Sequence, residues 1–173
     1  MPQKNKAKMK KLIFIRHGRA EDQAFEISDF ERSLTPKGKT ISKLMARSLR
    51  EKESSLGTML TSTAFRALET AYIFAIEFGI KPESIRADSN LYYKMNIHYL
   101  DELLSVIEDK NETITLFGHN PSFTEIVDNL CEEGCNFIPK CGIIGISFNI
   151  EKWSDLKHHT GKMEYFLIPE KPL

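Results

Sequence analysis

Residues 12–18 read Leu12-Ile13-Phe14-Ile15-Arg16-His17-Gly18, a short apolar run that ends in an arginine, a histidine and a glycine. Such a run predicts a buried strand, and parallel sheets usually place their chemistry at the carboxyl ends of their strands. Arginine offers paired N–H donors to a phosphate, and histidine offers a nitrogen that acts as nucleophile, acid or base near neutral pH. The stretch therefore indicates phosphate chemistry, although a strand edge with two polar residues would give the same pattern.

A second apolar run ends in a histidine in the same way. Residues 113–117, Thr-Ile-Thr-Leu-Phe, lead into Gly118-His119-Asn120-Pro121. Between the two runs, residues 59–71 predict a strand, a Ser/Thr turn and a helix whose first turn carries Arg66. The free amides and the dipole of a helix start favour anions, so Arg66 is well placed for a phosphate oxygen. Three strand ends thus offer Arg16, His17, Arg66 and His119.

The order of these motifs resembles the histidine phosphatase superfamily, which includes the phosphoglycerate mutases. The resemblance rests on Arg16-His17-Gly18, on Ser62 with Arg66-Ala67 and Thr70-Ala71, and on Gly118-His119. Residues 29–38, Asp-Phe-Glu-Arg-Ser-Leu-Thr-Pro-Lys-Gly, and the run Gly118-His119-Asn120-Pro121 are similar to the SixA-like branch of phosphohistidine phosphatases. The matching motifs extend from about Lys11 to Pro121.

The resemblance implies catalytic roles for four residues. The histidine of the first motif is the nucleophile of the family, so His17 is expected to attack phosphorus and to become a transient phosphohistidine. Arg16 and Arg66 would hold the non-bridging oxygens, and His119 would add a hydrogen bond or positive charge as the transition state develops. This chemistry needs no metal and no other cofactor.

Supporting roles remain open for four further residues. Arg32 is a weaker candidate for the phosphate pocket, and a loop ion pair with a neighbouring acid explains it equally well. Ser62 could orient a pocket residue or cap the following helix. Asn120 could aim His119 or belong to an ordinary Asn-Pro turn. Glu69 stands one helical turn from Arg66, where many relatives have glutamine, and would either steady Arg66 or weaken its hold on phosphate.

An expected carboxylic acid is missing. Many phosphatases and mutases of the superfamily carry one soon after the third strand, where it protonates a poor alkoxide leaving group, but residues 90–94 read Asn-Leu-Tyr-Tyr-Lys. Phosphohistidine needs less help, because its P–N bond releases an imidazole that can already be protonated. SixA-like proteins likewise lack this acid. Glu21 or Asp22, in the loop after the first motif, could replace it, although loop carboxylates are more often simply solvated.

The leading hypothesis is a phosphohistidine phosphatase that acts on a histidine phosphocarrier or signalling domain. The chain lacks the large insertions that cap the pocket in bigger relatives, and an open site suits a phosphorylated protein side chain. One alternative is a phosphomonoesterase of the same superfamily, with a small phosphorylated metabolite as substrate and Glu21 or Asp22 as acid. Another is a non-catalytic module that binds phosphoproteins, against which the four intact motif residues argue.

Strand and helix patterns alternate along the chain. Thr35-Pro36 begins a helix expected to reach about Lys52, and a strand near residues 58–61 precedes a helix over about 64–78. A short strand within residues 84–91, a helix over 97–107, a strand at 113–117 and a helix to about Leu130 follow. Residues 142–150 and 163–168 are two further β-rich runs. This order predicts a three-layer α/β/α sandwich with a mostly parallel central sheet, like the phosphoglycerate mutases.

Composition is consistent with one enzyme domain. The 173 residues include 24 basic and 24 acidic ones, and a net charge of zero gives no general attraction to nucleic acid or to an anionic membrane. Residues 1–10 are expected to be a flexible basic terminus, and residues 11–173 a single histidine phosphatase domain. No apolar run is long enough for a membrane span, and the start lacks the apolar stretch of a signal peptide. We therefore expect a cytoplasmic protein.

The chain contains three cysteines, Cys131, Cys135 and Cys141. Their spacing is not of the Cys-x-x-Cys type and has no close histidine pair, so we expect reduced thiols that mainly pack in the core. A zinc site that combines these cysteines with His158 or His159 is the alternative.

Overall fold

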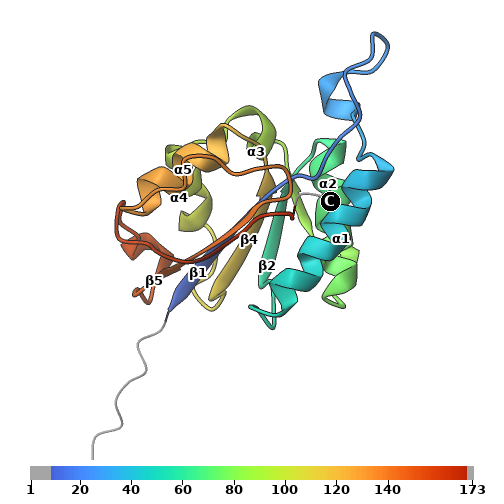
Figure 1. The fold of residues 1–173 in the computed structure, drawn as a ribbon. Coiled ribbons are helices and arrows are strands. Elements are labelled where there is room, and N and C mark those ends of the chain that lie inside the picture. Colours follow the sequence, from blue (N-terminus) through green and yellow to red (C-terminus); the bar gives the residue numbers. More distant parts are fainter. Residues whose placement is uncertain (1–8, 171–173) are drawn as a thin grey trace, which may run out of the picture.

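The computed structural model describes residues 9–170, which contain a six-stranded sheet in the order β3-β2-β4-β1-β5-β6 (Figure 1). The strands are β1 (Lys10–Arg16), β2 (Thr58–Ser62), β3 (Arg86–Asp88), β4 (Thr113–Gly118), β5 (Ile143–Phe148) and β6 (Lys162–Leu167). The first four strands are parallel, whereas β5 is antiparallel to β1 and β6 is antiparallel to β5. The predicted mostly parallel sheet is confirmed.

Helices cover both faces of this sheet, with α1 and α2 on one face and α3, α4 and α5 on the other (Figure 1). The helices are α1 (Pro36–Arg50), α2 (Phe65–Glu77), α3 (Asn90–Tyr93), α4 (Ile97–Ser105) and α5 (Ser122–Leu130), with short 3-10 turns η1 (Asp29–Glu31), η2 (Pro82–Ser84) and η3 (Trp153–Asp155). The three predicted layers are therefore present.

The central strand β1 is apolar on both faces because each face is covered by helices. Leu12 and Phe14 pack into the core beneath α4 and α5, whereas Ile13 and Ile15 pack into the core beneath α1 and α2. Successive side chains of a strand point to opposite faces, so a strand covered on both sides is an unbroken apolar run. This arrangement explains why the run stops at Arg16, where the strand emerges from between the layers.

Parallel pairing brings the carboxyl ends of three strands to one edge of the sheet. Arg16 at the end of β1 lies opposite Gly118 at the end of β4. β2 lies on the other side of β4 and ends at Ser62. Residues that follow these strands therefore share one edge, which is where an α/β sheet usually binds its ligand.

The start of α1 holds the segment that follows His17. The Thr35 side chain accepts a hydrogen bond from the Gly38 amide at 2.9 Å, and Pro36 is the first helical residue, so the expected helix start is confirmed. Gly38 lies so close to Arg19 that a Cβ atom on residue 38 would overlap the Arg19 carbonyl oxygen. The absence of a side chain at Gly38 thus allows this segment to pack directly on α1.

Most element boundaries lie within two residues of those expected from the sequence. The helix expected to reach Lys52 ends at Arg50, and the short strand expected within residues 84–91 is β3. Of the expected flexible basic terminus, residues 1–8 lie outside the described residues, as do residues 171–173 at the other end. Lys10 already belongs to β1 and is buried, with its Nζ donating to the carbonyl oxygen of Asp109. None of the helices within residues 9–170 has the length and apolar character needed to cross a membrane.

Candidate active site

His17 is the first residue after β1, and its imidazole is held in one tautomer. The side chain is buried, and Nδ1 lies 2.7 Å from the carbonyl oxygen of Gly18. A carbonyl oxygen only accepts hydrogen bonds, so Nδ1 carries the proton and Nε2 keeps its lone pair. Nε2 lies 3.3 Å from Nε of Arg66, which donates to it. The group that fixes the tautomer of His17 is therefore a backbone carbonyl.

Arg66 is the second residue of α2 and is buried beside His17. The hydroxyl of Thr70, one turn further along α2, donates to the Arg66 carbonyl oxygen at 2.6 Å and accepts from the Gly18 amide at 3.0 Å. This bridge ties the start of α2 to the backbone just after His17. In the motif Arg66-Ala67-x-x-Thr70, the arginine faces His17 and the threonine holds the helix start against the backbone of Gly18.

His119 follows β4 and faces His17 across the sheet edge, with 5.0 Å between the ring centres. Its Nε2 lies 2.8 Å from Oγ of Ser62. The same Oγ accepts from the amide of Ala64 at 3.2 Å, and Ala64, not Ser62, is the residue that caps α2. The position of Ser62 therefore favours orientation of His119 over the helix cap that the sequence had left open.

Arg16 closes β1, and its guanidinium is held from two sides. Nη1 donates to the carbonyl oxygen of Ile138 at 2.8 Å, and the guanidinium carbon lies 5.2 Å from the centre of the Phe137 ring. The Asn120 side chain donates to the same Ile138 carbonyl at 2.9 Å, and the bond between Asn120 and Pro121 is cis. Asn120 thus shares a backbone partner with Arg16.

Asp29 and Tyr92 join the site, and sequence reasoning missed both. Asp29 Oδ2 lies 2.9 Å from Nη2 of Arg66 and accepts from the Tyr92 hydroxyl at 2.8 Å. Its other oxygen accepts from Nη1 of Arg32 at 2.7 Å. Arg32 is thus engaged in the loop ion pair that was weighed against phosphate binding. The Tyr92 ring lies 5.3 Å from the ring of His119, so it forms part of the wall of the site.

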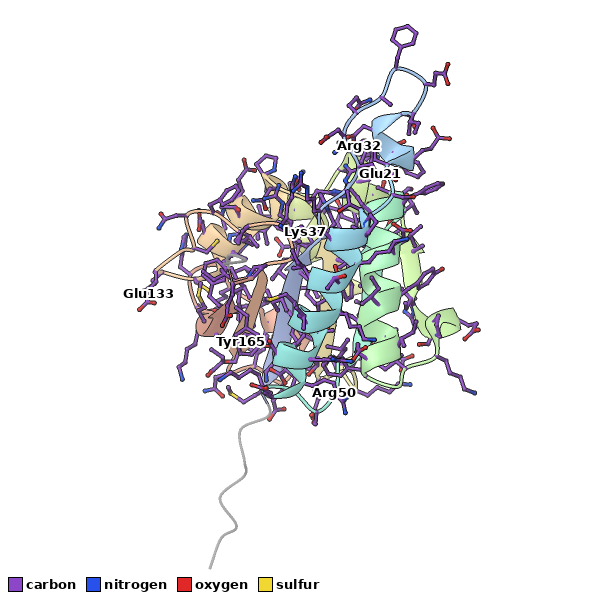
Figure 2. All side chains as sticks on the ribbon, turned by 45° about the vertical axis from the view of Figure 1, so that its right-hand side comes forward. Glu21, Arg32, Lys37, Arg50, Glu133 and Tyr165 are labelled. Carbon is purple, nitrogen blue, oxygen red and sulfur yellow. The ribbon has the colours of Figure 1, made fainter. Side chains whose placement is uncertain are left out.

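The other carboxylates considered from the sequence lie outside the contacts just described. Glu21 and Asp22 are exposed, and the Glu21 backbone carbonyl accepts from Nε of Arg32 at 2.6 Å. Residues 21–33 form a segment that projects from the body of the molecule, and Figure 2 shows Glu21 and Arg32 together at its base. Glu69 accepts from the amide of Leu34 at 2.5 Å and lies 3.3 Å from the Lys39 ammonium. Glu69 therefore fastens the end of this segment to α2.

Burial keeps both histidines uncharged. Burial, helped by the nearby His119 and by the charges of Arg66 and Arg16, lowers the pKa of His17 to about 2 although the Gly18 hydrogen bond raises it. Burial and the positive charge of Arg66 lower the pKa of His119 to about 3. Burial opposes ionisation of Asp29, but hydrogen bonds from Tyr92, Arg32 and Arg66 outweigh it and hold the pKa of that carboxyl well below its usual range. At neutral pH the site thus contains neutral imidazoles, cationic arginines and one carboxylate anion.

Buried polar atoms without hydrogen-bond partners concentrate at this site. Across residues 9–170, four buried side-chain atoms have none: Arg16 Nε, Thr63 Oγ1, His119 Nδ1 and Asn120 Oδ1. All four belong to residues at or just beyond the ends of β1, β2 and β4. Folded proteins pair nearly all buried polar groups, so each exception needs an explanation, and a catalytic or binding role is one. Thr63 had no distinguishing signal in the sequence and is a further candidate at the site.

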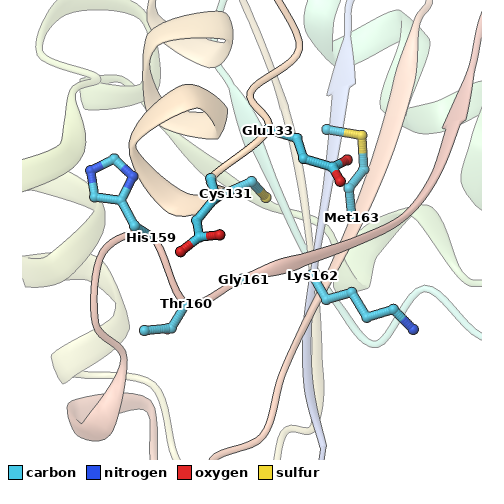
Figure 3. A pocket seen from close by; sticks show the side chains of 8 residues that line it. Cys131, Glu133, His159, Thr160, Gly161, Lys162 and Met163 are labelled. Atoms are coloured by element: carbon cyan, nitrogen blue, oxygen red, sulfur yellow. The ribbon is translucent and has the colours of Figure 1, made fainter.

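All three cysteines are free buried thiols. The backbone amide of Cys141 donates to the carbonyl oxygens of Arg16 and His17 at 3.1 and 3.0 Å, and its thiol lies 3.5 Å from the Ser42 hydroxyl. A pocket of about 430 Å³ is lined by Cys131, Glu133, His159 and their neighbours, and Figure 3 shows the His159 imidazole lying away from the Cys131 thiol. Burial, together with nearby carboxylates, raises the pKa of Cys131 to about 11, so its thiol stays protonated at neutral pH. Within residues 9–170, no group of three or more His, Cys, Asp or Glu side chains is arranged to hold a metal ion.

The lowered pKa of His17 predicts a pH-dependent stability. Below its ordinary pKa of 6.5 the histidine takes up a proton in the unfolded chain, but the folded site resists protonation down to about pH 2. The free energy of unfolding should therefore fall by about 1.4 kcal/mol per pH unit as the pH drops below about 6 on account of this group. Chemical denaturation at several pH values measures this free energy of unfolding. It should vary less steeply with pH for His17→Gln than for the wild type. Equal slopes for the two proteins would contradict the buried, neutral state of His17.

The chain is similar to a known protein in sequence and to known phosphatases in structure. No protein-family model matches the chain. It is 42% identical over 166 residues to an uncharacterised protein from Picosynechococcus sp., a match that covers 91% of this chain and 94% of that protein. A structure of the protein histidine phosphatase SixA complexed with tungstate superimposes with a TM-score of 0.76 at 19% identity, covering 91% of this chain and 96% of that one.

Two further solved structures show the same fold. A candidate phosphohistidine phosphatase SixA from Agrobacterium tumefaciens has a TM-score of 0.74 at 20% identity, covering 93% of this chain and 99% of that one. The mycobacterial glucosyl-3-phosphoglycerate phosphatase has a TM-score of 0.63 at 12% identity, covering 90% and 97% of the two chains. The expected phosphoglycerate mutase-like, SixA-like fold is confirmed.

Proposed function

Because the chain belongs to the family of the Picosynechococcus protein and has the SixA-like fold of the histidine phosphatase superfamily, we propose that it is a phosphohistidine phosphatase. Its substrate would be a phosphorylated protein, a histidine phosphocarrier or a signalling domain. The observation that carries the proposal is the position of His17 Nε2, whose lone pair lies beside Arg66 while Nδ1 is fixed by Gly18. A neutral, oriented imidazole next to cationic donors is what nucleophilic attack on a phosphoryl group requires.

The proposed reaction has two steps. His17 Nε2 attacks phosphorus, the substrate P–N bond breaks, and its electron pair stays on the nitrogen of the departing imidazole. Water then attacks the phosphohistidine at His17, which releases inorganic phosphate and restores the imidazole. Arg16 and Arg66 would hold the non-bridging oxygens in both steps, and His119, aimed by Ser62, would donate a hydrogen bond to one of them. Such a cycle needs no metal.

The state of the carboxylates favours a leaving group that needs no proton donor. Asp29 contacts Arg66, and its low pKa makes it an anion at neutral pH, unsuited to protonating an alkoxide. Glu21 and Asp22 are exposed on the projecting segment. A phosphoester would therefore lose the help of general acid catalysis, whereas an imidazole can leave as a neutral or protonated base. This difference supports phosphohistidine over the ester of a small metabolite.

Exposed aromatic side chains near the site support a protein substrate. Phe65, Tyr93 and Phe137 are 42%, 68% and 58% exposed. Phe137 contacts Arg16, and Tyr93 packs edge-on against Tyr92, whose ring in turn borders His119. Aromatic residues are enriched where proteins bind one another, because they offer a large rigid contact area. A macromolecule whose phosphorylated side chain reaches His17 would cover this surface.

Selectivity between leaving groups tests the proposal. Purified protein should dephosphorylate a phosphohistidine carrier protein at least about 100-fold more efficiently, by kcat/KM, than a sugar phosphate, because general acid help is worth about 10²- to 10⁴-fold for an ester. Glu21→Gln and Asp22→Asn should leave turnover of the carrier protein unchanged. Strong turnover of the sugar phosphate that is lost in either variant would support a phosphomonoesterase instead. Tight binding of the phosphorylated carrier without turnover would indicate a non-catalytic module.

A further inference from the structure

Asp29 engages the same face of Arg66 that a phosphoryl group would use. Arg66 Nη1 donates to the Asp29 backbone carbonyl at 2.5 Å, and Nη2 pairs with Asp29 Oδ2 at 2.9 Å. Both terminal nitrogens of the guanidinium are thus turned toward one residue. The N–H groups of arginine bind carboxylate and phosphate oxygens in the same way, so a phosphoryl group and the Asp29 carboxylate are alternative partners for Nη2.

We infer that Asp29 is a built-in competitor for the phosphate-binding face of Arg66, and that a phosphoryl group enters the site by displacing the Asp29 carboxylate. The inference rests on the proposed role of Arg66 as a phosphate ligand. It adds a residue that sets the affinity and selectivity of the site, because an entering anion must bind Arg66 more strongly than the carboxylate does. A phosphoryl dianion meets this requirement better than a singly charged carboxylate or halide.

The two partners differ in how firmly they are held. The Arg66 side chain is 7% exposed and sits in the first turn of α2, whereas the Asp29 side chain is 41% exposed. Asp29 belongs to the short turn η1 in residues 21–33, a segment that projects from the body of the molecule (Figure 1). Displacement therefore requires movement of an exposed turn and leaves the arginine in place.

Arg32 makes displacement less costly. Its Nη1 lies 2.7 Å from Asp29 Oδ1 and its Nε donates to the Glu21 carbonyl, both within the projecting segment. The Asp29 carboxylate can therefore leave Arg66 and remain paired with Arg32, which belongs to the same segment and moves with it. An anion that loses one partner but keeps another avoids the large cost of an unpaired charge. The hydrogen bond from the Tyr92 hydroxyl of α3 to the Asp29 carboxylate breaks together with the Arg66 contact.

Binding of tungstate tests the inference without any need for turnover. Calorimetric titration at low ionic strength should give an affinity about tenfold higher for Asp29→Asn than for the wild type, as expected if the carboxylate covers Arg66 about nine-tenths of the time. The matched control is Glu31→Gln, which removes a carboxylate from the same turn that contacts only Ser28. This variant should bind tungstate like the wild type. An affinity of Asp29→Asn equal to or below that of the wild type would show that Asp29 positions Arg66 and would overturn the inference.

Hydrogen exchange gives a second readout. Tungstate should speed exchange of amides in residues 21–33 of the wild type, including the Glu31 amide that donates to the Ser28 carbonyl at 3.1 Å. Slower exchange there would overturn the inference, as would absence of tungstate binding to both proteins. Tighter tungstate binding by Asp29→Asn in a protein that dephosphorylates no phosphohistidine substrate would uphold the role of Asp29 and refute the proposed function. The two failures are thus distinguishable.

Discussion

Replacement of His17 by alanine is expected to reduce phosphatase turnover by about 10⁴-fold or more, because it removes the nucleophile through which the whole cycle passes. No neighbouring group can take over, since the lone pair of His17 Nε2 is the one directed toward Arg66. His119 faces the same space, but its Nε2 is bonded to Ser62 and its remaining nitrogen, Nδ1, is the atom that would donate to the phosphoryl oxygen. The rate of phosphate release from a phosphohistidine carrier protein measures the effect.

Two controls separate lost chemistry from lost structure. His98→Ala changes an exposed histidine on α4, on the outer side of the fold, and should retain full turnover. The midpoint of thermal unfolding of His17→Ala should stay close to that of the wild type near neutral pH, because the lost imidazole contacts only Gly18 and Arg66 by hydrogen bonds. A folded His17→Ala protein with wild-type turnover would rule out the assigned nucleophile.

Replacement of Arg66 by lysine should lower kcat by about 10²- to 10³-fold, the usual cost of removing one preorganised donor to the developing charge. Lysine keeps the positive charge but loses the fork of N–H groups, which here donates from Nε to His17, from Nη1 to the Asp29 backbone carbonyl and from Nη2 to the Asp29 carboxylate. The loss should appear mainly in kcat, because the fork matches the transition state better than the ground state. Steady-state kinetics on the phosphohistidine carrier separate kcat from KM.

Arg47→Lys is the matched control for this variant. Arg47 pairs with Glu77 on the exposed side of α1 and α2, so the same exchange at that position should leave kcat and KM unchanged. A rise in KM without a change in kcat for Arg66→Lys would mean that Arg66 binds substrate and transition state equally. That result would contradict its role as a clamp on the developing charge.

The sequence predicted the parts of the site that follow directly from regular structure. Arg16 and His119 are tied to strand ends, and Arg66 to a helix start, so the apolar runs and the turn between them were enough to bring these residues to one edge of the sheet. The alternation of strands and helices likewise predicted the three layers. These features follow from local sequence patterns, because a parallel sheet brings the residues at the carboxyl ends of neighbouring strands close together.

Contacts made by irregular segments could not be predicted in this way. Asp29 reaches Arg66 because the segment after His17 folds back over α2, and no periodicity encodes that return. Tyr92 stands in a short stretch that was inspected for a carboxylate, yet its contribution is a hydroxyl directed at Asp29. The Gly18 carbonyl that fixes the tautomer of His17 could not be predicted from the sequence, because every residue has a backbone carbonyl. The spacing of Asp29 and Arg32 was the one available hint, since residues three apart in a helical turn can pair.

The central claim is that His17 carries the phosphoryl group between substrate and water. Rapid mixing of the protein with a phosphohistidine carrier, followed by quenching at alkaline pH and intact mass measurement, tests it most directly. We predict a transient mass increase of one phosphoryl group that maps to His17, decays as inorganic phosphate appears, and is absent in His17→Ala. Turnover of the carrier without any phosphorylated protein, or with the phosphoryl group on another residue, would contradict this account.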